Sequence, residues 1–430
     1  MDIETRTMRR VTVRLVPFLV LCYFIAFLDR SNLGYAALKM NADIHVSPRL
    51  FGIGAGIVFF VPYFLFEVPS NIALARFGAR IWIARIMLTW GIISGCMVFV
   101  TGDTSFFVVR ALLGAAEAGF FPGIIFFLTL WFPAAYRARI SGYFMAAIPL
   151  SAVVGSPLSG LLLQLDGAMG LHGWQWMFVL EALPAIVLAG FVLIYLQDRP
   201  ALAGWLPADE RAWLDNRLEQ EARQRIAAKH YSLGEALTNP KVLALSLVYF
   251  GAVSCLYGTG FFLPQIVAEF GLSTMMTLLV TAIPAVVGVF ACIAWSRSSD
   301  ARQERKGHLL ISLALATFGT LGCTLVSSPV LKMVSLSIAA FGIYGALPVF
   351  WTLPTAFLSG TAAAGGIAII NALGNLSGGF GPYMMGSLKE STGNFNAGLQ
   401  VLAATGAMGF VVLLLLGHDS RLERAPEPAE

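Results

Sequence analysis

The sequence predicts an all-α integral membrane protein, built from twelve transmembrane helices in two six-helix pseudo-repeat bundles. Composition is the first reason: of 430 residues, 57% are hydrophobic and only 12% are charged, whereas soluble domains carry about 25% charged residues. The second reason is a series of apolar runs that are long enough to cross a bilayer. The third is a single sizeable polar stretch, which separates six of these runs from the other six.

Hydropathy and length place the expected helices in chain order. They are Val11–Ala36, Leu50–Phe77, Ile81–Thr101, Ser105–Phe132, Ala138–Leu163, Trp174–Leu196, Lys241–Ala268, Thr274–Trp295, His308–Val326, Leu331–Leu358, Ala363–Leu388 and Phe395–Leu415.

The polar stretch divides the chain into residues 1–197, a first six-helix bundle, 198–240, a linker, and 241–430, a second bundle. Within the linker, WLPADERAWLDNRLEQEARQR mixes both signs of charge, which favours a solvated cytoplasmic helix over a binding domain. The fifth run carries GSPLSG and the eleventh carries GPYMMG. Recurrence at matching places predicts parallel repeats, a design that places substrate between the halves and alternates access by rocking.

Basic residues predict the topology. Arginines precede the first run, separate the second from the third, and follow the fourth, eighth and twelfth runs, whereas the opposite loops are poor in them. This alternation places both termini in the cytoplasm of a multi-pass inner-membrane protein. The first apolar run is too long for a signal-peptide core, so we expect it to be an uncleaved helix.

Two charged sites fall within the apolar runs of the first half. In RALLGAAEAGFFPG, Arg110 and Glu117 are seven residues apart, which places them on one helix face about two turns apart. A charge near the bilayer centre costs about 2.5–3.5 kcal/mol on insertion scales, so a partner, a wet cavity or a substrate path is expected. Asp29 and Arg30 form the second site. As helix neighbours they point about 100° apart and cannot pair well with each other.

These four groups have two interpretations. Asp29 and Arg30 could be a helix-end pair that extends to the membrane interface. Alternatively, Arg30 and Arg110 bind an anionic substrate, while Asp29 and Glu117 take up protons in a desolvated site. We favour the second interpretation, in which all four face one chamber between the bundles.

The remaining polar candidates are fewer. Tyr63 lies one turn before Glu67 and is either a substrate contact or a core residue. Glu67 and Arg85 are expected to form gate or structural ion pairs, and Glu181 is a further charge in the sixth run. In the second half the candidates are Trp351, Asn371 and Asn375. The two amides lie on one helix face, where they either contact substrate or form interhelical hydrogen bonds.

Several classes of function are disfavoured. The five cysteines, all in apolar runs and without a CxxC pair, are expected to be free and buried. No HExxH or comparable spacing predicts a metal site, and no basic run with interleaved aromatics predicts nucleic-acid binding. With no constellation of histidine, cysteine and carboxylate groups at one face, a membrane enzyme is disfavoured. We expect no cofactor other than the proton as coupling ion.

Five motifs carry a family resemblance that covers nearly the whole chain. They are FLDRSNLG, FLFEVPSN, RALLGAAEAGFFPG, LWFPAAYRARISGYFMAAIPL and NALGNLSGGFGP. Together they resemble the major facilitator superfamily, and within it the anion:cation symporter family of organic-acid, phthalate, tartrate and hexonate permeases.

The resemblance implies transport of an organic carboxylate with protons by a protein that commonly works as a monomer. It implies substrate-side cations at Arg30 and Arg110 and proton-coupling acids at Asp29 and Glu117. It also implies that Tyr63, Trp351 and Asn375 line the central cavity with Asn371 beside them. Phe27 stands where some sugar-acid carriers have tyrosine, which favours a less polar or aromatic acid.

The expected function is therefore proton-coupled uptake of an organic carboxylate anion, an aromatic acid, a dicarboxylate or a sugar acid, by alternating access. The nearer alternative is an exchanger or facilitator of organic anions on the same fold, which would show counterflow without accumulation driven by a pH difference. The expected partners are the small anion, protons and the lipid bilayer.

Overall fold

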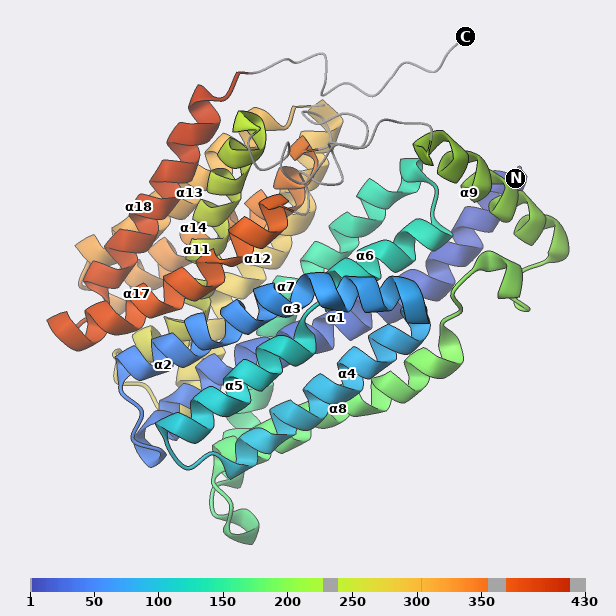
Figure 1. The fold of residues 1–430 in the computed structure, drawn as a ribbon. Coiled ribbons are helices and arrows are strands. Elements are labelled where there is room, and N and C mark those ends of the chain that lie inside the picture. Colours follow the sequence, from blue (N-terminus) through green and yellow to red (C-terminus); the bar gives the residue numbers. More distant parts are fainter. Residues whose placement is uncertain (1, 227–238, 303, 355–368, 418–430) are drawn as a thin grey trace.

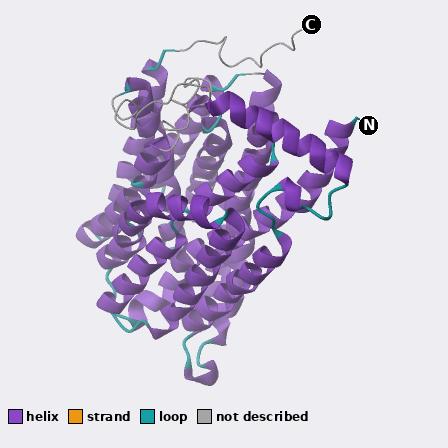
Figure 2. Ribbon diagram, turned by 45° about the vertical axis from the view of Figure 1, so that its right-hand side comes forward, coloured by secondary structure: helices purple, strands orange, loops and turns teal. Residues whose placement is uncertain are grey.

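The computed structural model describes residues 2–226, 239–302, 304–354 and 369–417. Within these ranges the regular elements are all helices (Figure 2). The main ones are α1 (Ile3–Asp43), α2 (Pro48–Ala55), α3 (Ile57–Phe77), α4 (Ala79–Gly95), α5 (Asp103–Glu117), α6 (Phe120–Trp131), α7 (Ala134–Leu162), α8 (Gly173–Tyr195), α9 (Ala208–Ile226), α11 (Pro240–Ala268), α12 (Thr274–Arg302), α13 (Lys306–Leu325), α14 (Pro329–Phe350), α17 (Ser377–Thr392) and α18 (Asn396–Leu415).

Eleven candidate membrane spans lie in the described residues, counted by helix length and hydropathy. They correspond to all the predicted runs except the eleventh, Ala363–Leu388, which lies partly outside the described residues. Its described part is helical over 369–375 and in α17. The start of α1 and the end of α18 lie at the same end of the molecule (Figure 1), as an even number of crossings requires. The end of the tenth predicted run, Leu331–Leu358, also falls partly outside the description.

Two predicted runs that read as continuous helices are interrupted. The run Leu50–Phe77 breaks at Gly56, which separates α2 from α3. The run Ser105–Phe132 breaks at Ala118 and Gly119, which separate α5 from α6. Gly119 has φ +87°, and a Cβ there would lie 2.3 Å from the Ser70 hydroxyl oxygen. Only glycine satisfies both conditions at this turn, so the break is encoded locally.

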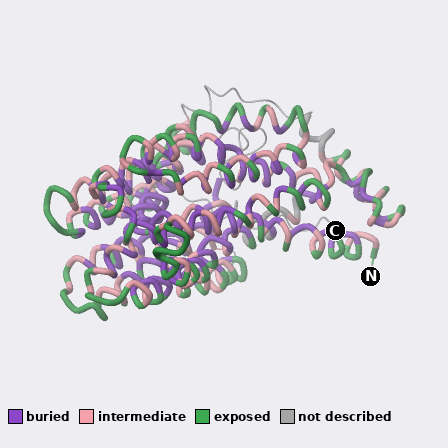
Figure 3. The backbone as a smooth tube through the Cα atoms, turned by 90° about the horizontal axis from the view of Figure 1, so that it is seen from below, coloured by how far each residue is buried: buried purple, intermediate pink, exposed green. Residues whose placement is uncertain are grey.

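The two halves meet along pairs of helices from opposite bundles: α1 packs on α11, α7 on α12 and α2 on α17. Buried residues concentrate on the inward sides of these helices (Figure 3). The α2–α17 contact lies at the end away from the chain ends (Figure 1). There a Cβ on Gly52 would lie 2.4 Å from the Pro382 carbonyl oxygen, and one on Gly386 would lie 2.1 Å from that of Pro48. Backbone therefore meets backbone, and this end is tightly closed.

Helix α9, which belongs to the predicted linker, is fastened to the start of α1. Glu210, with 1% of its side chain exposed, accepts from Arg6 Nε at 2.9 Å and lies 3.4 Å from Arg10 Nε. Asp209 pairs with the same Arg6 at 2.7 Å but is 56% exposed. The buried carboxylate is thus the main polar anchor between the linker helix and the first bundle.

Replacing this anchor should loosen α9. We expect Glu210→Ala to destabilise the docked helix by about 1.5–3 kcal/mol, the usual contribution of hydrogen bonds to a charged group. Faster limited proteolysis of α9 would measure the effect. Asp209→Asn is the matched control and should change stability by less than about 1 kcal/mol, because its ion pair is solvated. Equal proteolysis of the two variants would contradict the assignment.

Candidate functional site

The site is organised around Arg30, in the C-terminal half of α1. Its Nη2 donates to Glu117 Oε2 in an ion pair within the first bundle. Its Nη1 donates to the Tyr257 hydroxyl, 3.0 Å away on α11 of the second bundle. The side chain is only 13% exposed and that of Glu117 only 3%. One guanidinium therefore ties an acid of the first half to a hydroxyl of the second.

Aromatic rings surround this guanidinium. Its central carbon lies 5.2 Å from the ring centroid of Phe27, 5.3 Å from Phe59 and 5.6 Å from Tyr63. Cation–π attraction contributes about 0.5–2 kcal/mol per close ring when desolvated. The rings also exclude water, which strengthens the electrostatic interaction between Arg30 and Glu117.

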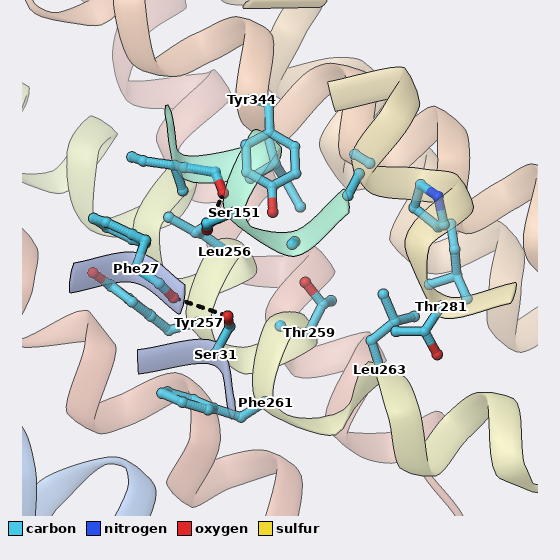
Figure 4. A pocket seen from close by; sticks show the side chains of 18 of the residues that line it. Phe27, Ser31, Ser151, Leu256, Tyr257, Thr259, Phe261, Leu263, Thr281 and Tyr344 are labelled. Carbon is cyan, nitrogen blue, oxygen red and sulfur yellow. Dashed lines mark hydrogen bonds between the residues drawn. The ribbon is translucent and has the colours of Figure 1, made fainter. Parts of the chain in front are cut away.

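Two cavities between the halves share Arg30, Phe27 and Tyr257 as lining residues. The larger, of about 100 Å³, lies between α1, α7, α11, α12 and α14. Figure 4 shows Ser151, Tyr257, Thr259 and Tyr344 around it. The smaller, of about 50 Å³, reaches toward the stretch 369–375. Ligand pockets usually measure about 300–1,000 Å³, so the structure is a compact state that must expand to hold an organic substrate.

Three of the predicted contacts, Tyr63, Asn371 and Asn375, line the smaller cavity. Asn371 is also engaged across the interface, where its Nδ2 donates to Glu67 Oε1 of α3 at 3.0 Å. The other oxygen of this buried carboxyl group has no hydrogen-bond partner. The predicted ion pair of Glu67 is thus replaced in the described residues by an amide contact that joins the two halves.

Removing the amide should favour opening between α3 and the stretch 369–375. Asn371→Ala leaves Glu67 without its described donor, and a hydrogen bond to a charged group contributes about 1.5–3 kcal/mol. We expect the form in which α3 and the stretch 369–375 have separated to become roughly tenfold or more populated. This would be measured as a longer distance between spin labels at the exposed positions Phe77 and Leu414. Glu67→Gln, which can still accept from Asn371, should shift the distance less.

The other predicted site residues lie outside both cavity linings. Arg110, 2% exposed, donates from Nε to the Gly54 carbonyl at 3.1 Å and from Nη2 to the Ala55 carbonyl at 3.3 Å. Its guanidinium carbon lies 4.4 Å above the Phe59 ring. Helix carbonyls freed by the break at Gly56 need donors, and Arg110 supplies them. It thus holds the interrupted second span in shape.

Asp29 and Trp351 are also displaced from the expected chamber. Asp29 turns into the first bundle, where its Oδ1 accepts from the Ser94 hydroxyl on α4 and from Asn32 Nδ2 at 3.4 Å. Trp351 packs edge-on against Tyr249, with ring centroids 5.0 Å apart, and Tyr249 in turn lines the smaller cavity. The four charged groups therefore do not share one chamber in this state: Arg30 lies at the cavities with Glu117 paired to it, while Asp29 and Arg110 lie elsewhere.

A family model described as the Major Facilitator Superfamily matches residues 19–382. The chain belongs to the Major Facilitator Superfamily. This confirms the superfamily and fold predicted from the motifs, and it makes the protein a multi-pass membrane transporter for a small organic substrate rather than an enzyme.

Similar superfamily members include a "Putative tartrate transporter" from Agrobacterium vitis, 51% identical over 97% of this chain and 96% of that protein. A "Quinolone resistance transporter" from Acinetobacter baumannii is 40% identical over 99% of this chain and 97% of that one. The solved partially occluded, inward-open xylose transporter XylE from E. coli has a TM-score of 0.77 and 14% identity, over 95% of this chain and 98% of that chain. That structural likeness concerns the superfamily fold.

Tyr257 and Tyr249 are site residues that sequence reasoning did not single out. Both lie on α11, eight residues apart, and both line the smaller cavity. A signal was present, because i and i+8 fall within one helix stripe and tyrosine hydroxyls in an apolar run need polar partners. Their partner in the first half could not be deduced from the spacing.

Proposed function

We propose that the protein is a secondary active transporter that takes up an organic carboxylate anion together with protons by alternating access. One observation carries this proposal: a buried arginine–carboxylate pair, Arg30–Glu117, forms part of the interface between the halves and reaches Tyr257 on the other side. Arginine is the side chain best suited to bind a carboxylate through two parallel hydrogen bonds.

The coupling follows from competition for one guanidinium. While Glu117 is ionised, it occupies Arg30 and takes the place that a substrate carboxylate would need. A proton on Glu117 releases Arg30, which then binds the substrate anion, and the halves rock to the other side. Loss of the proton restores the internal pair and expels the anion. The proton therefore favours the loaded state through differential binding.

The side chains around the Arg30 guanidinium indicate which class of acid fits the site. Phe27, Tyr63 and Tyr257 surround the cation and suit a flat or aromatic acid. The relative named as a tartrate transporter favours a dicarboxylate, and a sugar acid stays the third class. A thermal-shift screen of these three classes would separate them, because a specific ligand raises the melting temperature by mass action. We place the protein in the inner membrane as a monomer with both termini cytoplasmic, in keeping with its arginine-rich loops.

The deciding experiment is Glu117→Gln in proteoliposomes with an imposed pH difference. We expect the wild type to accumulate the acid against its gradient and the variant to lose accumulation while keeping exchange. Glu269→Gln is the matched control, because Glu269 pairs with Lys389 at the molecular surface and is 41% exposed. Accumulation by Glu117→Gln at the wild-type level would overturn the coupling role.

The rival on the same fold is an exchanger or facilitator, and the relative named as a quinolone resistance transporter adds outward movement as a direction to test. In the same vesicles this rival predicts counterflow by the wild type with no response to the pH difference.

A further inference from the structure

A second group of polar side chains is buried inside the first bundle, away from the cavity linings. Asp29 of α1 and Glu181 of α8 are each 2% exposed, and Asn32 of α1 is fully buried. Ser94 of α4 donates to Asp29 Oδ1, as does Asn32. Ser159 of α7 donates to Glu181 Oε1 at 2.8 Å. Helices α1 and α8 pack together, which brings Asn32 near the Glu181 carboxyl group.

Three acceptor atoms in this group have no hydrogen-bond partner: Asp29 Oδ2, Asn32 Oδ1 and Glu181 Oε2. A buried acceptor without a donor costs about 1–3 kcal/mol, so each of these atoms needs a donor. A proton on Glu181 Oε2 supplies one. The new O–H donates to Asn32 Oδ1, while Asn32 Nδ2 continues to donate to the ionised Asp29. One proton thus satisfies two of the three atoms.

The balance of charge inside the first bundle leads to the same conclusion. Among the residues whose burial is described, its interior holds four carboxyl groups and two guanidiniums, namely Asp29, Glu67, Glu117, Glu181, Arg30 and Arg110. Arg30 is engaged by Glu117 and Arg110 by backbone carbonyls. Among the described residues, no basic side chain forms an ion pair with Asp29 or Glu181. Of these two buried carboxyl groups without a counter-ion, at least one therefore takes up a proton.

The groups that face this pair are few. From α5, Arg110 and Glu117 act electrostatically on Asp29, and from α1 Tyr35 acts electrostatically on Glu181. Helices α4 and α7 present the hydroxyls of Ser94 and Ser159. Tyr35 also lines the larger cavity.

We propose that Asp29 and Glu181, linked by Asn32, hold one shared proton at a second site beside the substrate cavity, and that Glu181 is a proton-coupling residue. While the site is occupied, the proton moves from the carboxyl O–H of one acid to the carboxylate of the other. Once in each transport cycle it leaves the pair toward the cytoplasm, both acids are then ionised, and a new proton binds from outside. The coupling part of this proposal rests on the proposed symport function. The occupancy part, a protonated buried carboxyl group, does not.

Infrared difference spectroscopy of the purified full chain in nanodiscs tests occupancy. The wild type should show the carbonyl band of a protonated carboxylic acid at neutral pH, and Glu181→Gln should lose the share due to this pair. Ser159→Ala removes the hydroxyl that donates to ionised Glu181, so it should strengthen the band. This variant replaces Glu181→Gln as the test if Glu181→Gln folds poorly. Glu269→Gln should leave the band unchanged. An identical band in the wild type, Glu181→Gln and Ser159→Ala would overturn the proposal.

Proteoliposomes test coupling. The amide of Glu181→Gln mimics the protonated acid permanently, so one coupled proton should be lost. Each lost proton lowers the equilibrium accumulation of substrate about tenfold per pH unit of gradient. Glu181→Asp keeps an ionisable group and should retain part of the accumulation. Unchanged accumulation in Glu181→Gln would overturn the coupling role of Glu181 alone. Absence of pH-driven accumulation in the wild type would instead reject symport, and the infrared result would still decide occupancy.

Discussion

Arg30→Gln is expected to abolish uptake and to destabilise the protein. Glu117 would stay buried without its counter-ion, because one of its oxygens has no described partner and the other loses the Arg30 guanidinium. Breaking a buried ion pair from one side costs about 3–5 kcal/mol. Thermal unfolding in detergent and uptake by proteoliposomes would measure the two effects. Arg9→Gln, at an exposed position on the same helix, is the control and should match the wild type in both.

The double variant Arg30→Gln/Glu117→Gln separates stability from function. With both charges gone position 117 no longer carries an unpaired buried carboxylate, so most of the lost stability should return. Uptake should stay absent, because the substrate carboxylate has lost its cation. Wild-type uptake by Arg30→Gln would show that Arg30 does not bind the substrate.

Arg110→Met is expected to unfold or misfold much of the protein. The substitution leaves the carbonyls of Gly54 and Ala55 without their donor, and at about 1–3 kcal/mol for each buried unpaired acceptor the loss is about 2–6 kcal/mol. Arg110→Lys keeps the charge and should retain part of the stability. Melting temperature and yield of monodisperse protein would measure the difference.

The same variant decides between two roles for Arg110. A residue that holds the interrupted helix should affect stability first and leave substrate affinity of the folded fraction nearly unchanged. If Arg110→Met melted like the wild type and bound substrate poorly, Arg110 would be the substrate cation that the family resemblance implies.

These placements show which parts of the site could be predicted. Helix geometry alone predicts that Asp29 and Arg30 point in different directions, and the structure turns one into the first bundle and the other toward the cavities. Hydropathy places the spans, but it is insensitive to a break inside an apolar run. The break at Gly56 creates the free carbonyls that occupy Arg110, so the position of that guanidinium could not follow from its spacing to Glu117.

Trp351 illustrates the same limit. It comes immediately after the end of α14 and packs against Tyr249, so its distance from the substrate path depends on where that helix stops. Partners from the other half, such as Tyr257 for Arg30, depend on how two bundles dock. A single sequence predicts which stripe of each helix faces inward. It does not predict how the helices of one bundle align with those of the other.

The contact of α2 with α17 has a thermal consequence. Its closest approaches are between glycine and proline backbone, and these residues have no side-chain rotamers to fix when the surfaces meet. Apart from Glu390, which accepts from Ser47 Oγ and the Arg49 N–H across the contact, closing this end therefore fixes few side chains, and opening it frees few. Separating α2 from α17 therefore gains little side-chain entropy. This contact should make the equilibrium between closed and open forms only weakly dependent on temperature.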